Sequence, residues 1–262
     1  MTVIQYWDAE EPPQQIVELL ATFPRHNPGS RQLLFSESSA EALIAEHFTD
    51  REVRAFRACA VPASQADYLR YCAGYALGGI CLDADIQCGG DLGPVFAGPH
   101  RGILFGQQER LPDWIEHIFA WPYRVGPYRL VANGAFAFEQ ARNPLLGLAI
   151  EVATANIENR VADGLTGVWL TTGPGVLTSI YLLQRLGSID AFMRFAEGTV
   201  LDSTAALFCE VVGDWSRVDD ALDGVEMAPV EKIDKRVLRH VGVPRSEMDG
   251  AHWSTPEGSI FR

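Results

Sequence analysis

The sequence changes from a helical to a strand-like pattern within Leu77-Gly78-Gly79-Ile80-Cys81-Leu82-Asp83-Ala84-Asp85-Ile86. The preceding residues, 63–77, predict a helix, and the two glycines suit the left-handed turn at which helices end. The apolar residues 80–82 predict a buried strand. Asp83 and Asp85 follow this strand directly. The run therefore predicts a helix, a tight turn, a strand and a pair of acids, in that order.

Strand and helix patterns alternate on both sides of this run. Strands are expected at residues 3–7, 32–36, 102–106 and 128–138. Helices are expected at residues 14–23, from a cap at Ser38-Ser39-Ala40-Glu41 onward, and at 144–160, 176–186 and 189–195. The alternation predicts one α/β domain over residues 1–262. Residues from about 202 onward are less periodic, and residues 218–239 are interpreted as a solvated helix or tail.

Composition narrows the class of protein. A chain of 262 residues with 47% hydrophobic residues can form a substantial core, and its formal net charge of −13 disfavours nucleic acid as a partner. Lysine occurs only at Lys232 and Lys235, so residues 1–231 hold neither a Schiff-base lysine nor a P-loop lysine.

Cysteine spacing and the lack of a recognisable targeting pattern together predict a location in the cytoplasm. The five cysteines form no C-x-x-C pair, which favours reduced thiols. Residues 1–7 have no basic region followed by an apolar one, as a signal peptide has, and no apolar run reaches the length of a membrane span. We therefore expect a cytoplasmic protein without a transmembrane segment, which leaves room for peripheral contact with a membrane.

Two pairs of residues carry the candidate chemistry. Asp83 and Asp85 end a strand, where ligands bind in alternating α/β sheets, and two such carboxylates can hold Mn²⁺ or Mg²⁺. The alternative is a solvated turn. Asp67 and Arg70 share one face of the preceding helix, which the glycine turn folds back beside the strand. They form either a surface ion pair or a partly buried functional pair.

The residues around these pairs resemble a known family. The runs Ala66-Asp67-Tyr68-Leu69-Arg70-Tyr71 and 77–86 are similar to the "aDllRy…yGGvYlDtDv" signature of the DXD-containing sugar transferases of glycosyltransferase family 32. Residues 3–7 resemble the family's opening "iIHqiW" strand. Blocks at 133–136, 143–145 and 172–178, with Ala251-His252-Trp253, extend the resemblance over most of residues 3–180 and to the C-terminal region.

The resemblance implies a GT-A fold with a central mixed sheet flanked by helices, its core at about residues 3–200 and a segment 201–262 that closes the site. It implies a retaining hexosyltransferase that uses a nucleotide sugar (a UDP- or GDP-hexose) and Mn²⁺ or Mg²⁺, with a glycan, lipid-linked or other hydroxyl acceptor, as in polysaccharide biosynthesis.

The resemblance also implies roles for individual residues. Asp85 would ligate the metal, and Asp83 would touch the ribose or sugar and reach the metal directly or through water. Asp67 and Arg70 would hold donor hydroxyls and phosphate, and Asn133 would lie near the sugar. Trp7 resembles the ring that stacks on the base, or is a core residue. His252 matches a C-terminal metal ligand, or is merely exposed.

Departures from the family pattern leave alternatives open. The family's histidine in the first strand is Ile4, its tyrosine after the glycine pair is Cys81, and its closing serine-tryptophan is not recognisable. A non-catalytic relative that binds sugar nucleotides or glycans is therefore the second hypothesis. A sugar nucleotidylyltransferase is disfavoured, because residues 8–13 hold no glycine-rich basic loop.

Overall fold

The structure is a computed structural model that describes residues 1–107, 130–161, 164–229, 233, 236–241 and 260–262. The strands are β1 (Thr2–Tyr6), β2 (Arg31–Phe35), β3 (Gly79–Leu82), β4 (Ile86–Cys88), β5 (Gly102–Gln107), β6 (Leu130–Phe138), β7 (Val225–Pro229) and β8 (Leu238–His240). The helices are α1 (Gln14–Leu20), α2 (Thr22–His26), α3 (Glu37–His47), α4 (Asp50–Ala58), α5 (Pro62–Leu77), α6 (Gly93–Phe96), α8 (Pro144–Asn159), α9 (Gly164–Thr171), α10 (Pro174–Leu186), α11 (Ile189–Ala196), α12 (Asp202–Val212) and α13 (Trp215–Leu222).

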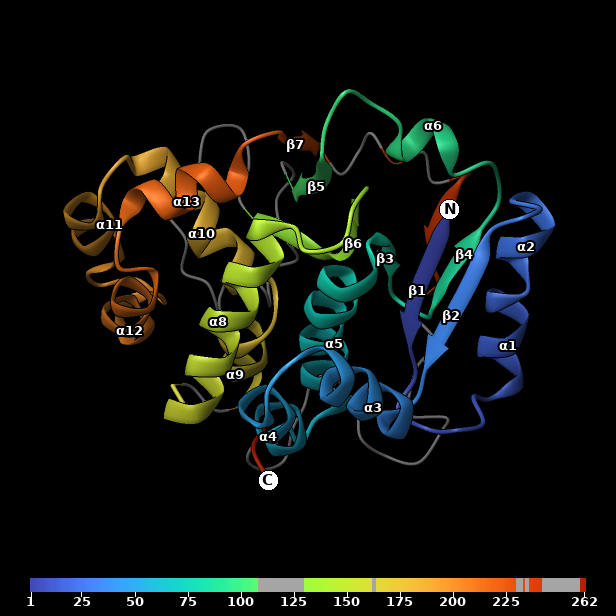
Figure 1. Cartoon of the computed structure of the whole chain (residues 1–262), viewed down its shortest axis with the longest axis horizontal. Coiled ribbons are helices and arrows are strands. Elements are labelled where there is room, and N and C mark those ends of the chain that lie inside the picture. Colours follow the sequence, from blue (N-terminus) through green and yellow to red (C-terminus); the bar gives the residue numbers. More distant parts are fainter. Residues whose placement is uncertain (108–129, 162–163, 230–232, 234–235, 242–259) are drawn as a thin grey trace.

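Six strands form a central mixed sheet in the order β2-β1-β3-β6-β5-β7. β1 pairs in parallel with β2 and β3, β6 runs antiparallel to β3 and β5, and β7 runs parallel to β5. β4 and β8 form a separate antiparallel pair. Helices pack on this sheet (Figure 1), which confirms the predicted α/β class with a mixed central sheet flanked by helices.

Alternation along the strands divides the core between the two faces of the sheet. Ile4, Tyr6 and Cys81 belong to the large apolar cluster that includes α5, α8 and α10. Val3 and Ile80 belong to a second cluster, with residues of α2, α6, β4 and β8. Because successive side chains of a strand point to opposite faces, these strands are buried on both sides.

The chain leaves α5 through two glycines with positive φ, as expected, although the ψ of Gly78 is −176° and not that of the left-handed helix. Helix α5 has Pro62 in its first turn and ends at Gly78, whose φ is 66°. Gly79 follows with φ of 107°, and a Cβ there would lie 2.7 Å from the Thr2 carbonyl oxygen of β1. Glycine at both positions therefore lets the chain reverse tightly from α5 into β3.

Two of the expected helix boundaries were wrong. The helix expected at 14–23 is two helices, since α1 ends before Ala21 and α2 begins at Thr22. Helix α3 is capped by Ser36 rather than from Ser38, because Ser36 and Ser39 bond each other's backbone N–H in a capping box.

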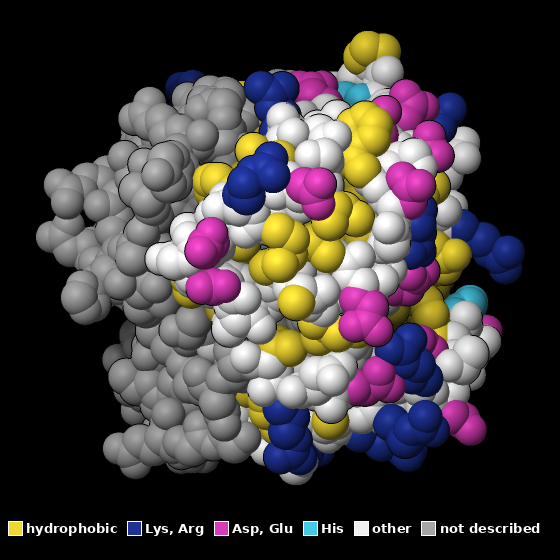
Figure 2. Space-filling model, turned by 90° about the vertical axis from the view of Figure 1, so that its left-hand side faces the viewer, with side chains coloured by type: hydrophobic (Ala, Val, Ile, Leu, Met, Phe, Trp, Pro, Cys, Tyr) yellow, Lys and Arg dark blue, Asp and Glu magenta, His cyan; other side chains and the backbone are white. Residues whose placement is uncertain are grey.

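The C-terminal region is more ordered than its pattern indicated. Residues 202–222 form α12 and α13, in which Val218 is fully buried, and residues 225–229 form a strand of the central sheet. The interpretation of 218–239 as a solvated helix or tail agrees with the helix up to Leu222, in which Asp219 and Asp220 are exposed, and was wrong for residues 225–229. Apolar, acidic and basic side chains are interspersed on the face that carries α11 and α12 (Figure 2).

Candidate active site

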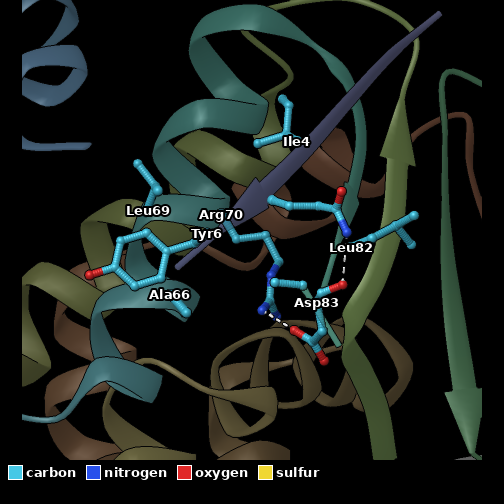
Figure 3. Close-up of a pocket in the computed structure, with 9 residues that line it drawn as sticks. Ile4, Tyr6, Ala66, Leu69, Arg70, Leu82 and Asp83 are labelled. Atoms are coloured by element: carbon cyan, nitrogen blue, oxygen red, sulfur yellow. Dashed lines mark hydrogen bonds and ion pairs between the residues drawn. The ribbon is translucent and has the colours of Figure 1, made fainter. Parts of the chain in front are cut away.

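The candidate site lies where β1 and β3 end beside α5. A pocket there is lined by residues of β1, of α5 and of the segment after β3: Ile4, Gln5, Tyr6, Ala66, Leu69, Arg70, Leu82, Asp83 and Ala84. Figure 3 shows the guanidinium of Arg70 directed at the carboxylate of Asp83. Because β1 and β3 are parallel, their carboxyl ends meet at one edge of the sheet, which is where α/β proteins bind ligands.

Arg70 lies at the centre of the site and is buried. Its Nη2 atom donates to Asp83 Oδ1, and its Nη1 atom lies 3.3 Å from Asp67 Oδ1 and 2.5 Å from the carbonyl oxygen of Asn133. Burial acts to lower the pKa of Arg70, but the carboxylates of Asp83 and Asp67 outweigh it and raise the pKa. Arg70 therefore stays charged and links α5 to Asp83, directly after β3, and to Asn133 within β6.

Asp67 is buried one helical turn before Arg70. Besides Arg70, its Oδ1 atom accepts a hydrogen bond of 2.9 Å from Asn133 Nδ2. Burial raises the pKa of Asp67 to about 7, although Arg70 and Asn133 both favour the ionised carboxylate. On its other side, a Cβ at Gly173 would lie 3.2 Å from Asp67 Oδ2, so the start of α10 packs closely against this carboxylate.

Asp83 is held by its backbone as well as by Arg70. Its N–H donates to the carbonyl oxygen of Gly134 over 3.1 Å, and its carbonyl oxygen accepts from Gln5 Nε2 over 3.1 Å. Among the described residues, no protein donor contacts Asp83 Oδ2. One carboxylate oxygen of Asp83 is thus available to a ligand.

A bulge in β6 places Asn133 and Gly134 in the site. The register with β5 shifts between Leu104, which pairs with Phe136, and Phe105, which pairs with Ala132. Three residues of β6 therefore have no counterpart on β5, and bulges of this kind re-aim side chains near active sites. A Cβ at Gly134 would lie 2.5 Å from Asp83 Oδ2, so glycine here leaves the carboxylate in place, whereas a side chain would require it to shift.

Asp83, Asp85 and His240 could together hold a metal ion. Their ligand atoms all lie within 4.8 Å of one another, and His240 Nε2 lies 3.1 Å from Asp85 Oδ2. Strand β8 places the histidine, since Ile86 pairs with His240 and Val241 N–H donates to the Asp85 carbonyl oxygen. The hydrogen bond to Asp85 raises the pKa of His240. Two carboxylates and an imidazole suit Mn²⁺, and the carboxylates also suit Mg²⁺, so this donor set fits the predicted cation.

Most of the predicted site residues therefore lie together: Asp67, Arg70, Asp83, Asp85 and Asn133. Trp7 follows β1 but is buried among Ile16, Leu20 and Ala84, outside the pocket lining. Its stacking on a base stays a prediction. His252 lies outside the described residues.

The sequence interpretation missed three residues of the site: Gln5, Gly134 as a packing position, and His240. A short β-prone run at 237–241, with His240 in alternation with Leu238, is the signal that indicates a strand there. The sequence pattern does not indicate that this strand pairs with the residues after Asp85. Gln5 is a polar residue within an apolar strand, which is a signal that its side chain has a specific partner.

Comparison with known proteins gives a likeness of fold. No protein-family model and no curated protein matches the sequence. Among solved structures, the PaToxG glycosyltransferase is similar, with a TM-score of 0.50, 13% identity and coverage of 85% of each chain. The central sheet and helices described above thus have the arrangement of a known glycosyltransferase. Within the described residues, no helix combines the length and apolar character needed to cross a bilayer.

Proposed function

We propose that the protein is a metal-dependent, retaining glycosyltransferase that moves a hexose from a UDP- or GDP-sugar to a hydroxyl acceptor. The observation that carries the proposal is the convergence of Asp83, Asp85 and His240 beside the buried cation Arg70, at the carboxyl end of β3. The fold, which is similar to that of a glycosyltransferase, supports the same reaction class.

The residues of the site suit the electrostatic demand of this reaction. Departure of the nucleoside diphosphate concentrates negative charge beside the transferred sugar, and a pre-oriented positive charge lowers the barrier. Arg70 supplies such a charge, held by Asp67, Asn133 and Asp83. A divalent cation bound by Asp83 and Asp85 would neutralise further charge on the diphosphate.

The donor sugar would be oriented by the acceptors and donors around Arg70. Carboxylates accept hydrogen bonds from sugar hydroxyls, and the Asn133 amide can both donate and accept. Asp67 and Asn133 already bond each other over 2.9 Å, so their orientation is set before a sugar binds. Such fixed contacts would place the anomeric carbon for attack by an acceptor hydroxyl from a glycan or lipid-linked substrate.

The third metal ligand has two candidates. His240 has its Nε2 atom within the cluster and a side chain that is 61% exposed, which leaves it accessible. His252 is the candidate from the family resemblance. We favour His240 because of its position beside Asp85.

A second candidate function is a non-catalytic binder of sugar nucleotides or glycans. The observation that favours it is that Arg70 already donates to three protein acceptors. A guanidinium with five N–H groups retains donors for a phosphate, but a purely structural role would explain the same contacts. Donor binding without turnover across many acceptors would support this reading.

A donor panel tests the proposal directly. Purified protein is incubated with UDP- and GDP-hexoses in Mn²⁺, Mg²⁺ or EDTA, and release of nucleoside diphosphate is measured with and without acceptors. The expected result is release from one donor that stops in EDTA and returns with Mn²⁺. No release from any donor, together with no metal-dependent binding of UDP or GDP, would contradict the proposal.

A further inference from the structure

Gln5 connects β2, β1 and the segment that carries Asp83. Its Nε2 atom donates to the Asp83 carbonyl oxygen over 3.1 Å, a bond drawn as a dashed line in Figure 3. Its Oε1 atom accepts from Gln32 Nε2 over 2.9 Å, and the same Gln32 nitrogen lies 3.1 Å from the carbonyl oxygen of Leu20. Both ends of the Gln5 amide are therefore bonded.

The position of Gln5 in its strand is otherwise apolar. Residues two apart in a strand share a face, and on this face of β1 Val3 packs with Ile80 and Leu82. Gln5 itself is only 2% exposed. A buried amide is less favourable than an aliphatic side chain unless it is hydrogen-bonded, so stability alone does not call for glutamine here. The two bonds of its amide are what distinguish it from valine or leucine at this position.

The Asp83 carbonyl oxygen accepts from Gln5 Nε2 and, over 3.4 Å, from the Ile86 N–H of its own turn, so the Gln5 bond ties this turn to β1. A peptide unit is planar, so holding the Asp83 carbonyl oxygen also orients the bond from Asp83 to Ala84. The far side of the turn is held separately, where Val241 N–H donates to the Asp85 carbonyl oxygen over 3.0 Å. Gln5 and β8 thus hold the Asp83–Asp85 turn at its two ends.

We infer that Gln5 is a positioning residue for the metal site: its amide holds the Asp83–Asp85 turn so that both carboxylates face one cation. The inference rests on the proposed metal-dependent function and goes beyond it, because Gln5 itself is no ligand. Residues that orient metal ligands commonly change metal affinity by about 10- to 100-fold when they are replaced.

The test is binding of Mn²⁺ alone, measured from the electron paramagnetic resonance signal of the free ion. Gln5→Leu removes both bonds with little change in size. Gln5→Glu keeps the acceptor for Gln32 but places an oxygen opposite the Asp83 carbonyl oxygen. Gln65→Leu is the matched control, since Gln65 is as deeply buried and bonds Tyr6 rather than Asp83.

We expect the Kd for Mn²⁺ to rise about 10-fold or more in both Gln5 variants and to stay unchanged in Gln65→Leu. A Kd within twofold of wild type in folded Gln5 variants would overturn the inference and leave the proposed function intact. Loss of folding in both variants would show a purely structural role and also overturn it. Failure of the wild-type protein to bind Mn²⁺ would instead contradict the proposed function on which the inference rests.

Discussion

The Nε2 atom of His240 lies 3.1 Å from the Oδ2 atom of Asp85, although the two residues come from distant parts of the chain. The contact is set by backbone pairing, because β8 runs antiparallel to β4, directly after Asp85. An imidazole thereby joins the carboxylates of Asp83 and Asp85, of which Asp83 is bonded to Arg70.

Replacement of His240 by alanine is expected to weaken Mn²⁺ binding by about 10-fold or more, because one of the three proposed protein ligands would be lost. The Kd is measured from the electron paramagnetic resonance signal of free Mn²⁺. His26→Ala, an exposed histidine on α2, is the control and should leave the Kd unchanged. A normal Kd in His240→Ala with a raised one in His252→Ala would assign the ligand to the C-terminal motif instead.

The Asp85→Asn variant is expected to lose metal-dependent donor turnover by about 100-fold or more, since an amide is neutral and a much weaker ligand for a hard cation. Turnover is followed as nucleoside diphosphate release, with circular dichroism to verify folding. Asp190→Asn, in the exposed first turn of α11, serves as the control. Undiminished turnover in folded Asp85→Asn would remove Asp85 from the mechanism.

The Gly134→Ala change is expected to displace the Asp83 carboxylate, since the added methyl group would lie 2.5 Å from Oδ2. We expect Mn²⁺ affinity and donor turnover to fall by about 10-fold. Gly147→Ala in α8 adds the same methyl group beside the Tyr75 ring, away from the site, and should leave both values unchanged. Equal Mn²⁺ affinity and turnover in Gly134→Ala and Gly147→Ala would show that the Asp83 carboxylate can shift without loss of function.

Asp67 is expected to make stability depend on pH. Burial raises its pKa to about 7 in the folded protein, whereas an unperturbed aspartate titrates near about 3.9. Between these values the folded state holds the proton more tightly, so stability falls as pH rises from about 4 to 7 and then levels. In Asp67→Asn this contribution is absent. The thermal midpoint of wild type relative to Asp67→Asn should thus fall over that range, by about 2–4 °C for each kcal/mol of this contribution.

Other carboxylates titrate in both wild type and Asp67→Asn, so their effect on the thermal midpoint cancels in the difference between these two proteins. A relative midpoint that rises with pH would mean that the Arg70 ion pair dominates and that Asp67 is ionised throughout. In that case the proposed contact of Asp67 with donor hydroxyls would involve a permanent carboxylate.

The sequence predicted those parts of the site that are joined by local chain geometry. Asp67 and Arg70 share a face because they are three residues apart in a helix, and the glycine pair then brings that helix beside Asp83. These relations depend on periodicity and turn chemistry, which are written in nearby residues. The α/β class was predicted for the same reason.

The parts that were not predicted depend on contacts between distant segments. The pairing of β8 with β4 and of β7 with β5 brings C-terminal residues into place, and periodicity does not encode which strands pair. The β6 bulge is likewise a matter of register. The 218–239 interpretation went wrong because short strands with mixed charge resemble a solvated surface when their partners are unknown.

The place of β7 in the sheet has a consequence for synthesis on the ribosome. β5 lies between β6 and β7, so its outer hydrogen-bonding edge stays open until residues 225–229 have emerged. His240 emerges later still, whereas Asp83 and Asp85 are made early. A nascent or split copy that stops before residue 225 therefore presents an unprotected strand edge, prone to pairing with other chains, and lacks His240 of the proposed metal site.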